Sequence, residues 1–238
     1  MGASCLLIHG FTGTPHELSP LTDLLEQRGH HVVTPVLAGH GGSRQDMDRV
    51  SWIDWIHSAE IVFLEQVKQH GPLHLVGFSM GGLIAAYLTS KYPDKVVTLT
   101  TLSAPIYMIN PKQIFKSIAE AIQKSMRAQG RSEDMTRYLG KVRNTPFRSL
   151  AHLRRLVQTV RPIFDKLEVP LLVAQGNLDD LVEPSSAQYI FDHARSTDKQ
   201  LHFFSQSGHM ICHDCETEQV CQLVTKFIED HDQSLFST

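Results

Sequence analysis

Residues 73–82 read LHLVGFSMGG, an apolar run that passes directly into a serine at position 79 flanked by small residues. The apolar run is typical of a buried strand, and a helical pattern follows from Gly82 to Lys91. In a G-x-S-x-G turn between a strand and a helix, the small residues let the backbone reverse sharply and hold the serine in a strained conformation. The stretch therefore predicts that the Ser79 hydroxyl lies above a sheet, at the N-terminus of a helix.

Similar apolar runs recur along the chain, separated by helix-length segments, as in a parallel sheet buried on both faces. The alternation predicts a doubly wound α/β fold with a mainly parallel sheet of about six or seven strands. Strands are expected at residues 5–8, 31–34, 73–76, 96–102, 171–174 and 201–204, and helices at 18–28, 53–69, 82–91, 185–194 and 217–229.

One connection is too long for a simple crossover. Residues 105–169 carry three helical patterns: Ile114, Ile118, Ile122 and Met126 at i,i+4 spacing, a second helix from Ser132, and a third after Pro146. We therefore expect a core domain of residues 1–104 and 170–238, interrupted by a small helical cap, or lid, at 105–169.

The insert also differs from the core in charge. It holds 13 Lys or Arg against 5 Asp or Glu, so it carries +8, whereas the remainder carries −11. Such a basic surface can simply be a solvated face that docks on an acidic body, or it can attract an anionic or interfacial substrate.

Composition narrows the class of protein. The 238 residues are 42% hydrophobic and 20% charged, a composition that excludes a disordered chain. The net charge of −3 gives no indication of nucleic-acid binding. Four cysteines are too few for a disulfide scaffold, and the N-terminal apolar run is too short for a signal peptide or membrane span. We expect a cytoplasmic protein without stable membrane insertion, either a monomer or a homodimer.

A serine hydroxyl is a poor nucleophile at neutral pH and needs a histidine as base and a carboxylate to orient that base. Asp179 and Asp180 follow the strand expected at 171–174, and His209 follows the strand at 201–204. The order Ser, Asp, His thus comes from successive strand ends, where α/β sheets build their sites. Backbone N–H groups of Met80 and Phe11 are the natural donors to an oxyanion.

These residues lie in segments that resemble those of a known protein family. The segments HGFTGTP at 9–15, GHG at 39–41, WIDW at 52–55, GFSMGG at 77–82 and SGH at 207–209 are similar to those of the α/β-hydrolase superfamily, in particular small bacterial carboxylesterases and monoacylglycerol lipases. The resemblance implies Ser79 as nucleophile, His209 as base, Asp179 rather than Asp180 as acid, and Phe11 with Met80 as the oxyanion hole. It also implies that the cap covers the acyl pocket.

Fourteen histidines and a Cys-x-x-Cys pair invite a different interpretation. His209, Cys212, His213 and Cys215 resemble half of a zinc site. A single pair lacks the further ligands that structural zinc needs, so we expect Cys212, Cys215 and Cys221 to be small buried residues around the last helix. We expect no metal or organic cofactor. His9 is expected to brace its loop by hydrogen bonds.

The sequence thus predicts a serine carboxylesterase acting on a small-molecule ester of short to medium chain length. Phe11, Met80, Phe78, Ile106, Tyr107 and Met108 lie near the expected mouth and suit an apolar acyl chain, although such residues are often simply core. The alternatives are a monoacylglycerol lipase, a thioesterase or acyltransferase, and a binding module that uses the same fold without catalysis.

Overall fold

The computed structural model describes residues 2–108 and 147–232. Six strands form one fully parallel sheet in the order β2-β1-β3-β4-β5-β6. They are β1 (Ser4–Ile8), β2 (His31–Val33), β3 (Leu73–Phe78), β4 (Val96–Leu102), β5 (Leu171–Gly176) and β6 (Lys199–Phe204). All six predicted strands are confirmed. Strand β3 runs two residues further than predicted, because Gly77 and Phe78 remain buried and paired with β4.

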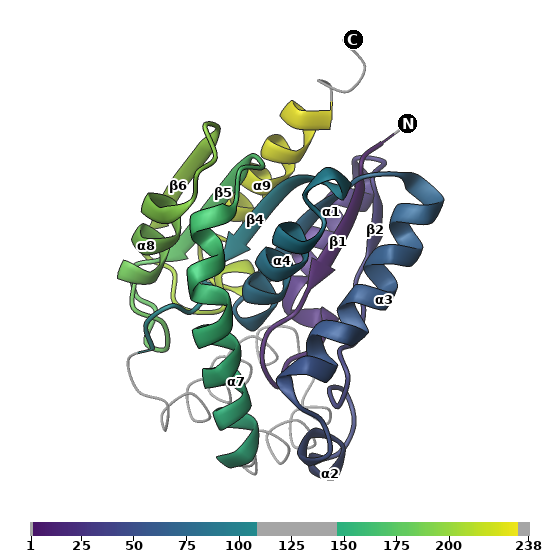
Figure 1. Ribbon diagram of the computed structural model, residues 1–238. Helices are drawn as coiled ribbons and strands as arrows, with labels where there is room; N and C mark the ends of the chain where they lie inside the picture. Colours follow the sequence, from purple (N-terminus) through teal and green to yellow (C-terminus); the bar gives the residue numbers. More distant parts are fainter. Residues whose placement is uncertain (1, 109–146, 233–238) are drawn as a thin grey trace, which may run out of the picture.

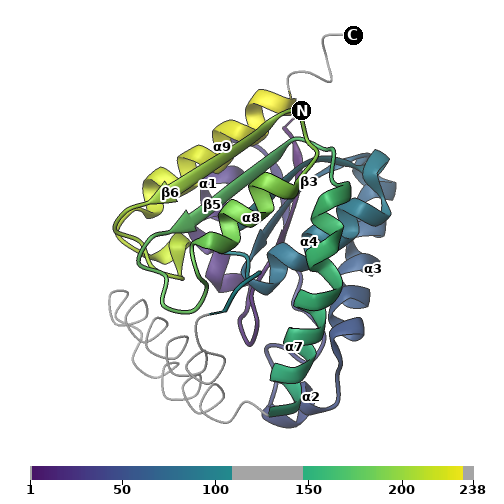
Figure 2. The ribbon, with the colours of Figure 1, turned by 60° about the vertical axis from the view of Figure 1, so that its left-hand side comes forward.

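Helices cover both faces of the sheet (Figures 1 and 2). Helices α1 (Ser19–Gln27) and α9 (Thr217–Asp232) pack together on one face, and α3 (Trp52–His70), α4 (Met80–Lys91) and α8 (Ser185–His193) lie on the other. The predicted helices at these positions are confirmed, with α4 beginning at Met80 rather than Gly82. The short helix α2 (Arg44–Asp48) was not predicted, although Ser43 and Asp46 form a capping box at its start.

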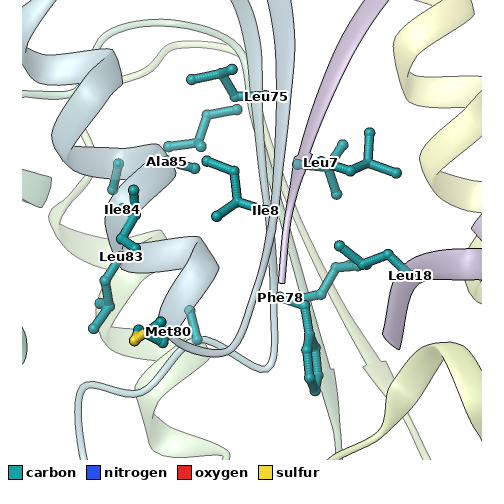
Figure 3. Packing of buried hydrophobic residues seen from close by; sticks show 14 of the residues in the cluster. Leu7, Ile8, Leu18, Leu75, Phe78, Met80, Leu83, Ile84 and Ala85 are labelled. Carbon is teal, nitrogen blue, oxygen red and sulfur yellow. The ribbon is translucent and has the colours of Figure 1, made fainter. Parts of the chain in front are cut away.

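The core is built in layers around the central strands. Leu6, Leu75, Leu99 and Leu171 occupy one row of register across β1, β3, β4 and β5, and all four are fully buried. Figure 3 shows side chains of α4 on one side of the sheet and Leu18 with Phe78 on the other. Residues 80–86 of α4 are buried without exception, as expected for a helix enclosed on all sides. This enclosure fixes the start of α4, and hence the residue before it, against the sheet.

Part of the long insertion belongs to the described structure. Its third predicted helix is confirmed as α7 (Phe147–Val160), whereas the two predicted helices at 114–126 and from Ser132 lie outside the described residues. Leu153, Leu156 and Val160 are buried on α7, which contacts α3 and α4. In Figure 1, α7 runs along the sheet face beside α4 and extends past the carboxyl ends of the strands.

We expect Leu156→Ala to lower the free energy of unfolding by about 2–5 kcal/mol, because Leu156 is fully buried and the truncation leaves a cavity. The exposed neighbour Arg155 provides the control, and Arg155→Ala is expected to stay within about 0.5 kcal/mol of wild type. Urea unfolding midpoints measure both. Equal midpoints for the two variants would show that α7 does not dock as described.

Candidate active site

Ser79 lies in a strained turn between β3 and α4, as the sequence predicted. Its φ is +51° and ψ −119°, an unusual conformation for a residue with a side chain, and its N–H donates to Leu102 O at 2.8 Å. The turn requires glycine on both sides. A Cβ on Gly77 would overlap the backbone of Gly81, and a Cβ on Gly81 would overlap the carbonyl of Ile8. Close packing against β1 therefore determines where the hydroxyl lies.

The structure brings together the three residues that the sequence predicted as a triad. Ser79 Oγ lies 3.1 Å from His209 Nε2, and His209 Nδ1 lies 2.8 Å from Asp179 Oδ2. They come from the ends of β3, β5 and β6, and each is at least nine-tenths buried. Asp180 is exposed and makes no such contact, so Asp179 is the acid that meets the ring.

Asp179 is held by four hydrogen bonds. Its Oδ1 accepts the N–H groups of Leu181 and Val182 at 2.9 Å each, and its Oδ2 accepts Gln175 Nε2 and His209 Nδ1 at 2.8 Å each. Burial alone would raise the pKa of Asp179, but His209 and the backbone donors together lower it below its ordinary value. Asp179 is therefore ionised, and the Nε2 lone pair of His209 faces the serine hydroxyl.

The pKa of His209 moves in the opposite direction to that of the other buried histidines. Burial lowers it, but the charge and hydrogen bond of Asp179, with a smaller contribution from Glu17, raise it above its ordinary value. A hydroxyl hydrogen-bonded to this imidazole can transfer its proton to Nε2 as it attacks a substrate, because Asp179 stabilises the resulting imidazolium.

His9 braces the first strand-end loop, as predicted. Its Nδ1–H donates to Gly10 O at 2.9 Å, and its Nε2 accepts the Leu37 N–H at 3.1 Å, so one ring joins two loops. His40 packs against it with ring centroids 5.0 Å apart. Burial lowers the pKa of His9 to about 3 and that of His40 to about 4. Both rings are therefore neutral.

Both predicted oxyanion donors lie near Ser79: Met80 follows it in the chain, and Phe11 lines the same pocket. Met80 is the first residue of α4, where N–H groups have no partner within the helix. Phe11 lies in a turn that the Gly13 N–H closes on Gly10 O at 3.2 Å, with Thr12 at a φ of +60°. Both side chains are buried.

A small pocket adjoins Ser79. It is lined by Phe11, Ser79, Pro105, Met108, Leu153, Leu181, Val182 and His209. Phe11 and Met108 were predicted to lie at the mouth. Of the other residues predicted there, Phe78 has its ring centroid 5.1 Å from that of His209, and Tyr107 packs against Tyr189 and Arg161. Met80 and Ile106 are buried.

The sequence did not predict the remaining lining residues, because they are far from Ser79 in the chain and reach the pocket only through tertiary packing. Leu153 comes from α7, and Leu181 and Val182 come from the segment that also binds Asp179. Met108 reaches the pocket because it forms an antiparallel bridge with Val182. A polar residue that ends an apolar strand, as Gln175 does, was the available signal for its partnership with Asp179.

Two further observations concern the alternatives raised by the sequence. The expectation of a buried thiol is confirmed for Cys212 and Cys221 but is wrong for Cys215, which is exposed; all three are free thiols. Residues 2–108 and 147–232 contain no group of three or more His, Cys, Asp or Glu arranged to hold a metal ion. Among the helices of the described residues, none is long and apolar enough to cross a membrane.

The parallel sheet, the strained serine turn and the His209 and Asp179 loops define an α/β-hydrolase. Residues 1–216 match the Hydrolase_4 family, described as serine aminopeptidase, S33, and the chain belongs to this family.

Comparison with individual proteins points to lipases and esterases. The chain is 28% identical to a thermostable monoacylglycerol lipase of Bacillus sp. (strain H-257), over 95% of this chain and 90% of that protein. It is 27% identical to a carboxylesterase of Bacillus subtilis (strain 168), over 95% and 92%. Solved structures with the same fold include one from work on the metagenome-derived lipolytic enzymes LipS and LipT, with a TM-score of 0.80, 21% identity and coverage of 97% and 96%. Another is the monoacylglycerol lipase of Paleococcus ferrophilus, with a TM-score of 0.73, 17% identity and coverage of 97% of both chains.

Buried neutral histidines should make the protein less stable in acid. Burial lowers the pKa of His74, the second residue of β3, to about 3. Between about pH 6.5 and 3, the unfolded chain therefore binds a proton there that the folded chain does not. His74 thus contributes stability above pH 6.5 that is lost as the pH falls. We expect His74→Leu to reduce the slope of unfolding free energy against pH by about 1.4 kcal/mol per pH unit between pH 6 and 4.

Thr98→Val is the matched control, because it removes the 2.9 Å hydrogen bond between Thr98 Oγ1 and His74 Nδ1 but keeps the titrating ring. Urea unfolding at several pH values measures the slopes. The explanation would be wrong if Thr98→Val flattened the slope as much as His74→Leu.

Proposed function

We propose that the protein is a serine carboxylesterase that hydrolyses short- to medium-chain carboxylic esters. The observation that carries this proposal is the hydrogen-bonded series Ser79–His209–Asp179, with distances of 3.1 and 2.8 Å, at the edge of an apolar pocket. A non-catalytic binding module would not need these three side chains in this arrangement.

The reaction proceeds in two halves. In the first, Ser79 Oγ attacks the acyl carbonyl while its proton passes to His209 Nε2, and His209 then gives that proton to the leaving alcohol. The product of this half is an acyl ester of Ser79. In the second half, water loses a proton to His209 as it attacks the acyl group, and Ser79 recovers the proton as the acid leaves. Asp179 remains ionised throughout and stabilises the imidazolium.

Each attack produces a negatively charged oxygen that needs preorganised donors. We assign this role to the backbone N–H groups of Met80 and Phe11. The first turn of α4 supports the assignment, because its unpaired N–H groups and dipole favour negative charge beside Ser79.

The pocket favours an acyl group over a peptide. Pro105, Met108, Leu153, Leu181 and Val182 present apolar surface, which suits a hydrocarbon chain. The names of the curated relatives, a monoacylglycerol lipase and a carboxylesterase, agree with an ester substrate.

Monoacylglycerol hydrolysis is the second candidate, and similarity to the Bacillus monoacylglycerol lipase over nearly the whole chain favours it. It uses the same triad and differs only in the leaving alcohol. We retain the division into a core of residues 1–104 and 170–238 and a cap of 105–169 as part of the proposal, because Leu153 of α7 lines the pocket.

A fluorophosphonate probe is expected to label the wild-type protein on Ser79, and Ser79→Ala should abolish both labelling and hydrolysis of p-nitrophenyl butyrate. Labelling that survived the substitution would exclude Ser79 as nucleophile. The wild-type protein should then be assayed with p-nitrophenyl esters of increasing chain length, with monoacylglycerols, with an acyl-CoA and with an aminoacyl p-nitroanilide. A preference for the acyl-CoA or the anilide would contradict the carboxylesterase proposal.

Asp179→Asn is expected to lower kcat for p-nitrophenyl butyrate by roughly 10⁴-fold, because an amide can hold His209 in the wrong tautomer and cannot stabilise the imidazolium. Asp180→Asn makes the same chemical change at the exposed neighbour and should retain most of the wild-type kcat. Steady-state kinetics at pH 8 compare the two. The assignment is refuted if Asp180→Asn causes the larger loss.

A further inference from the structure

Glu17 is a buried carboxyl group that the proposed reaction does not use. It lies in the 3₁₀ turn Pro15–Leu18, directly after the loop that carries Phe11, and is only 5% exposed. Its Oε2 accepts the Gly10 N–H at 2.8 Å. Lysine and arginine residues of the described structure form no ion pair with it. Burying a carboxyl group without a cation costs free energy, which the contacts of Glu17 with this loop must offset.

The two glycines of the loop make room for this carboxyl group. A Cβ on Gly13 would overlap the carboxyl atoms of Glu17, and a Cβ on Gly10 would lie 3.2 Å from Glu17 Oε2. The carboxyl therefore occupies the volume that side chains at positions 10 and 13 would otherwise fill. It contacts both ends of the turn at once.

Between these two glycines the backbone is strained. The Gly13 N–H closes the turn on Gly10 O at 3.2 Å, and Thr12 adopts a φ of +60°, in the left-handed region. A strained turn persists only where surrounding contacts hold it. Glu17 supplies a hydrogen bond to Gly10 and a packing surface for Gly13, so it fixes both ends of the segment that contains Phe11.

We propose that Glu17 is a positioning residue for the oxyanion hole: its carboxyl group holds the turn from Gly10 to Gly13 so that the Phe11 N–H stays aimed at the oxygen above Ser79. This inference rests on the proposed function, because it assigns Glu17 a role only if Phe11 donates to an oxyanion. The backbone of the turn, rather than the substrate, is what Glu17 touches.

The same carboxyl group lies within electrostatic reach of the base. Burial raises the pKa of Glu17 to about 7, although the Gly10 N–H and the charge of His209 act in the opposite direction. The titratable groups within electrostatic reach of it are His209 and Cys212, both from the segment after β6. His9, from the end of β1, is neutral. An ionised Glu17 raises the pKa of His209, so its removal should lower that pKa.

Two substitutions separate the hydrogen bond from the charge. Glu17→Gln keeps an oxygen that can accept the Gly10 N–H but removes the charge, whereas Glu17→Met keeps the volume and removes the acceptor. We expect Glu17→Met to reduce kcat for p-nitrophenyl butyrate at least about 10-fold below Glu17→Gln with little change in KM, because oxyanion donors act mainly in the transition state. The loss should stay below the roughly 10²- to 10³-fold cost of deleting a donor.

The pH profile separately measures the effect of the Glu17 charge on His209. For Glu17→Gln, the acid limb of kcat/KM should shift to lower pH relative to wild type, because His209 loses a nearby negative charge. Glu26→Gln is the matched control, since Glu26 is an exposed glutamate on the next helix, α1, and its profile should coincide with that of wild type.

Either of two results would overturn the inference: a kcat for Glu17→Met within about 2-fold of that for Glu17→Gln, or a loss in Glu17→Met that appears in KM rather than in kcat. If Glu17→Met does not fold, as judged by its thermal melt, Gly13→Ala decides, because a Cβ at position 13 would overlap the Glu17 carboxyl and displace it. A wild-type kcat for Gly13→Ala would then overturn the inference. Failure of the proposed function looks different, because then the wild-type protein itself would not hydrolyse the ester or would hydrolyse it without Ser79.

Discussion

The close approach of three backbone segments at the first turn of α4 is the constraint on which the site depends. Gly81 lies against the carbonyls of Ile8 and His9, and Gly82 is so close to Ala104 that a Cβ there would be 2.8 Å from the Ala104 side chain. The ends of β1, β3 and β4 are therefore held at fixed distances from Ser79. A larger residue at position 81 would push α4 away from β1, and with it the serine away from the Phe11 loop.

Because the sheet is parallel, the same edge also receives the other functional loops. The loops after β5 and β6 bring Asp179 and His209 to the Ser79 hydroxyl, although these residues are far apart in the sequence. Buried hydrogen bonds then fix each loop: His9 to Leu37, and Asp179 to the backbone that follows it. In a low-dielectric interior such bonds are strong when made and costly when lost, so the site is rigid where its geometry matters.

Features that depend on local pattern were predictable from the sequence. Apolar runs marked all six strands, and the strand-to-helix serine turn was clear because small residues at 77, 81 and 82 are required locally. The choice of Asp179 over Asp180 rested on resemblance alone. The structure adds its physical reason: Asp179 accepts the N–H groups of Leu181 and Val182 with one oxygen, which turns the other toward His209.

Features that depend on packing could not be predicted. The pocket residues Leu153 and Val182 come from segments about thirty positions apart in the chain, and their approach depends on how α7 docks on α4. Glu17 reads as an ordinary charged residue near a helix start. Only the fold shows that the glycines at positions 10 and 13 leave space for its carboxyl group.

Burial acts on the charges around Ser79 in different ways, and the neighbours of each group decide the result. His9 and His40 lose their charge because no carboxylate compensates their desolvation, whereas Asp179 compensates that of His209. His209 therefore forms an ion pair with Asp179 as soon as it is protonated. Around the loop that carries Phe11 lie the neutral rings of His9 and His40 and the carboxyl group of Glu17, whose pKa is raised to about 7 by burial. In the proposed reaction, the imidazolium of His209 would form beside Asp179, and the negative charge would develop near groups that carry little charge of their own.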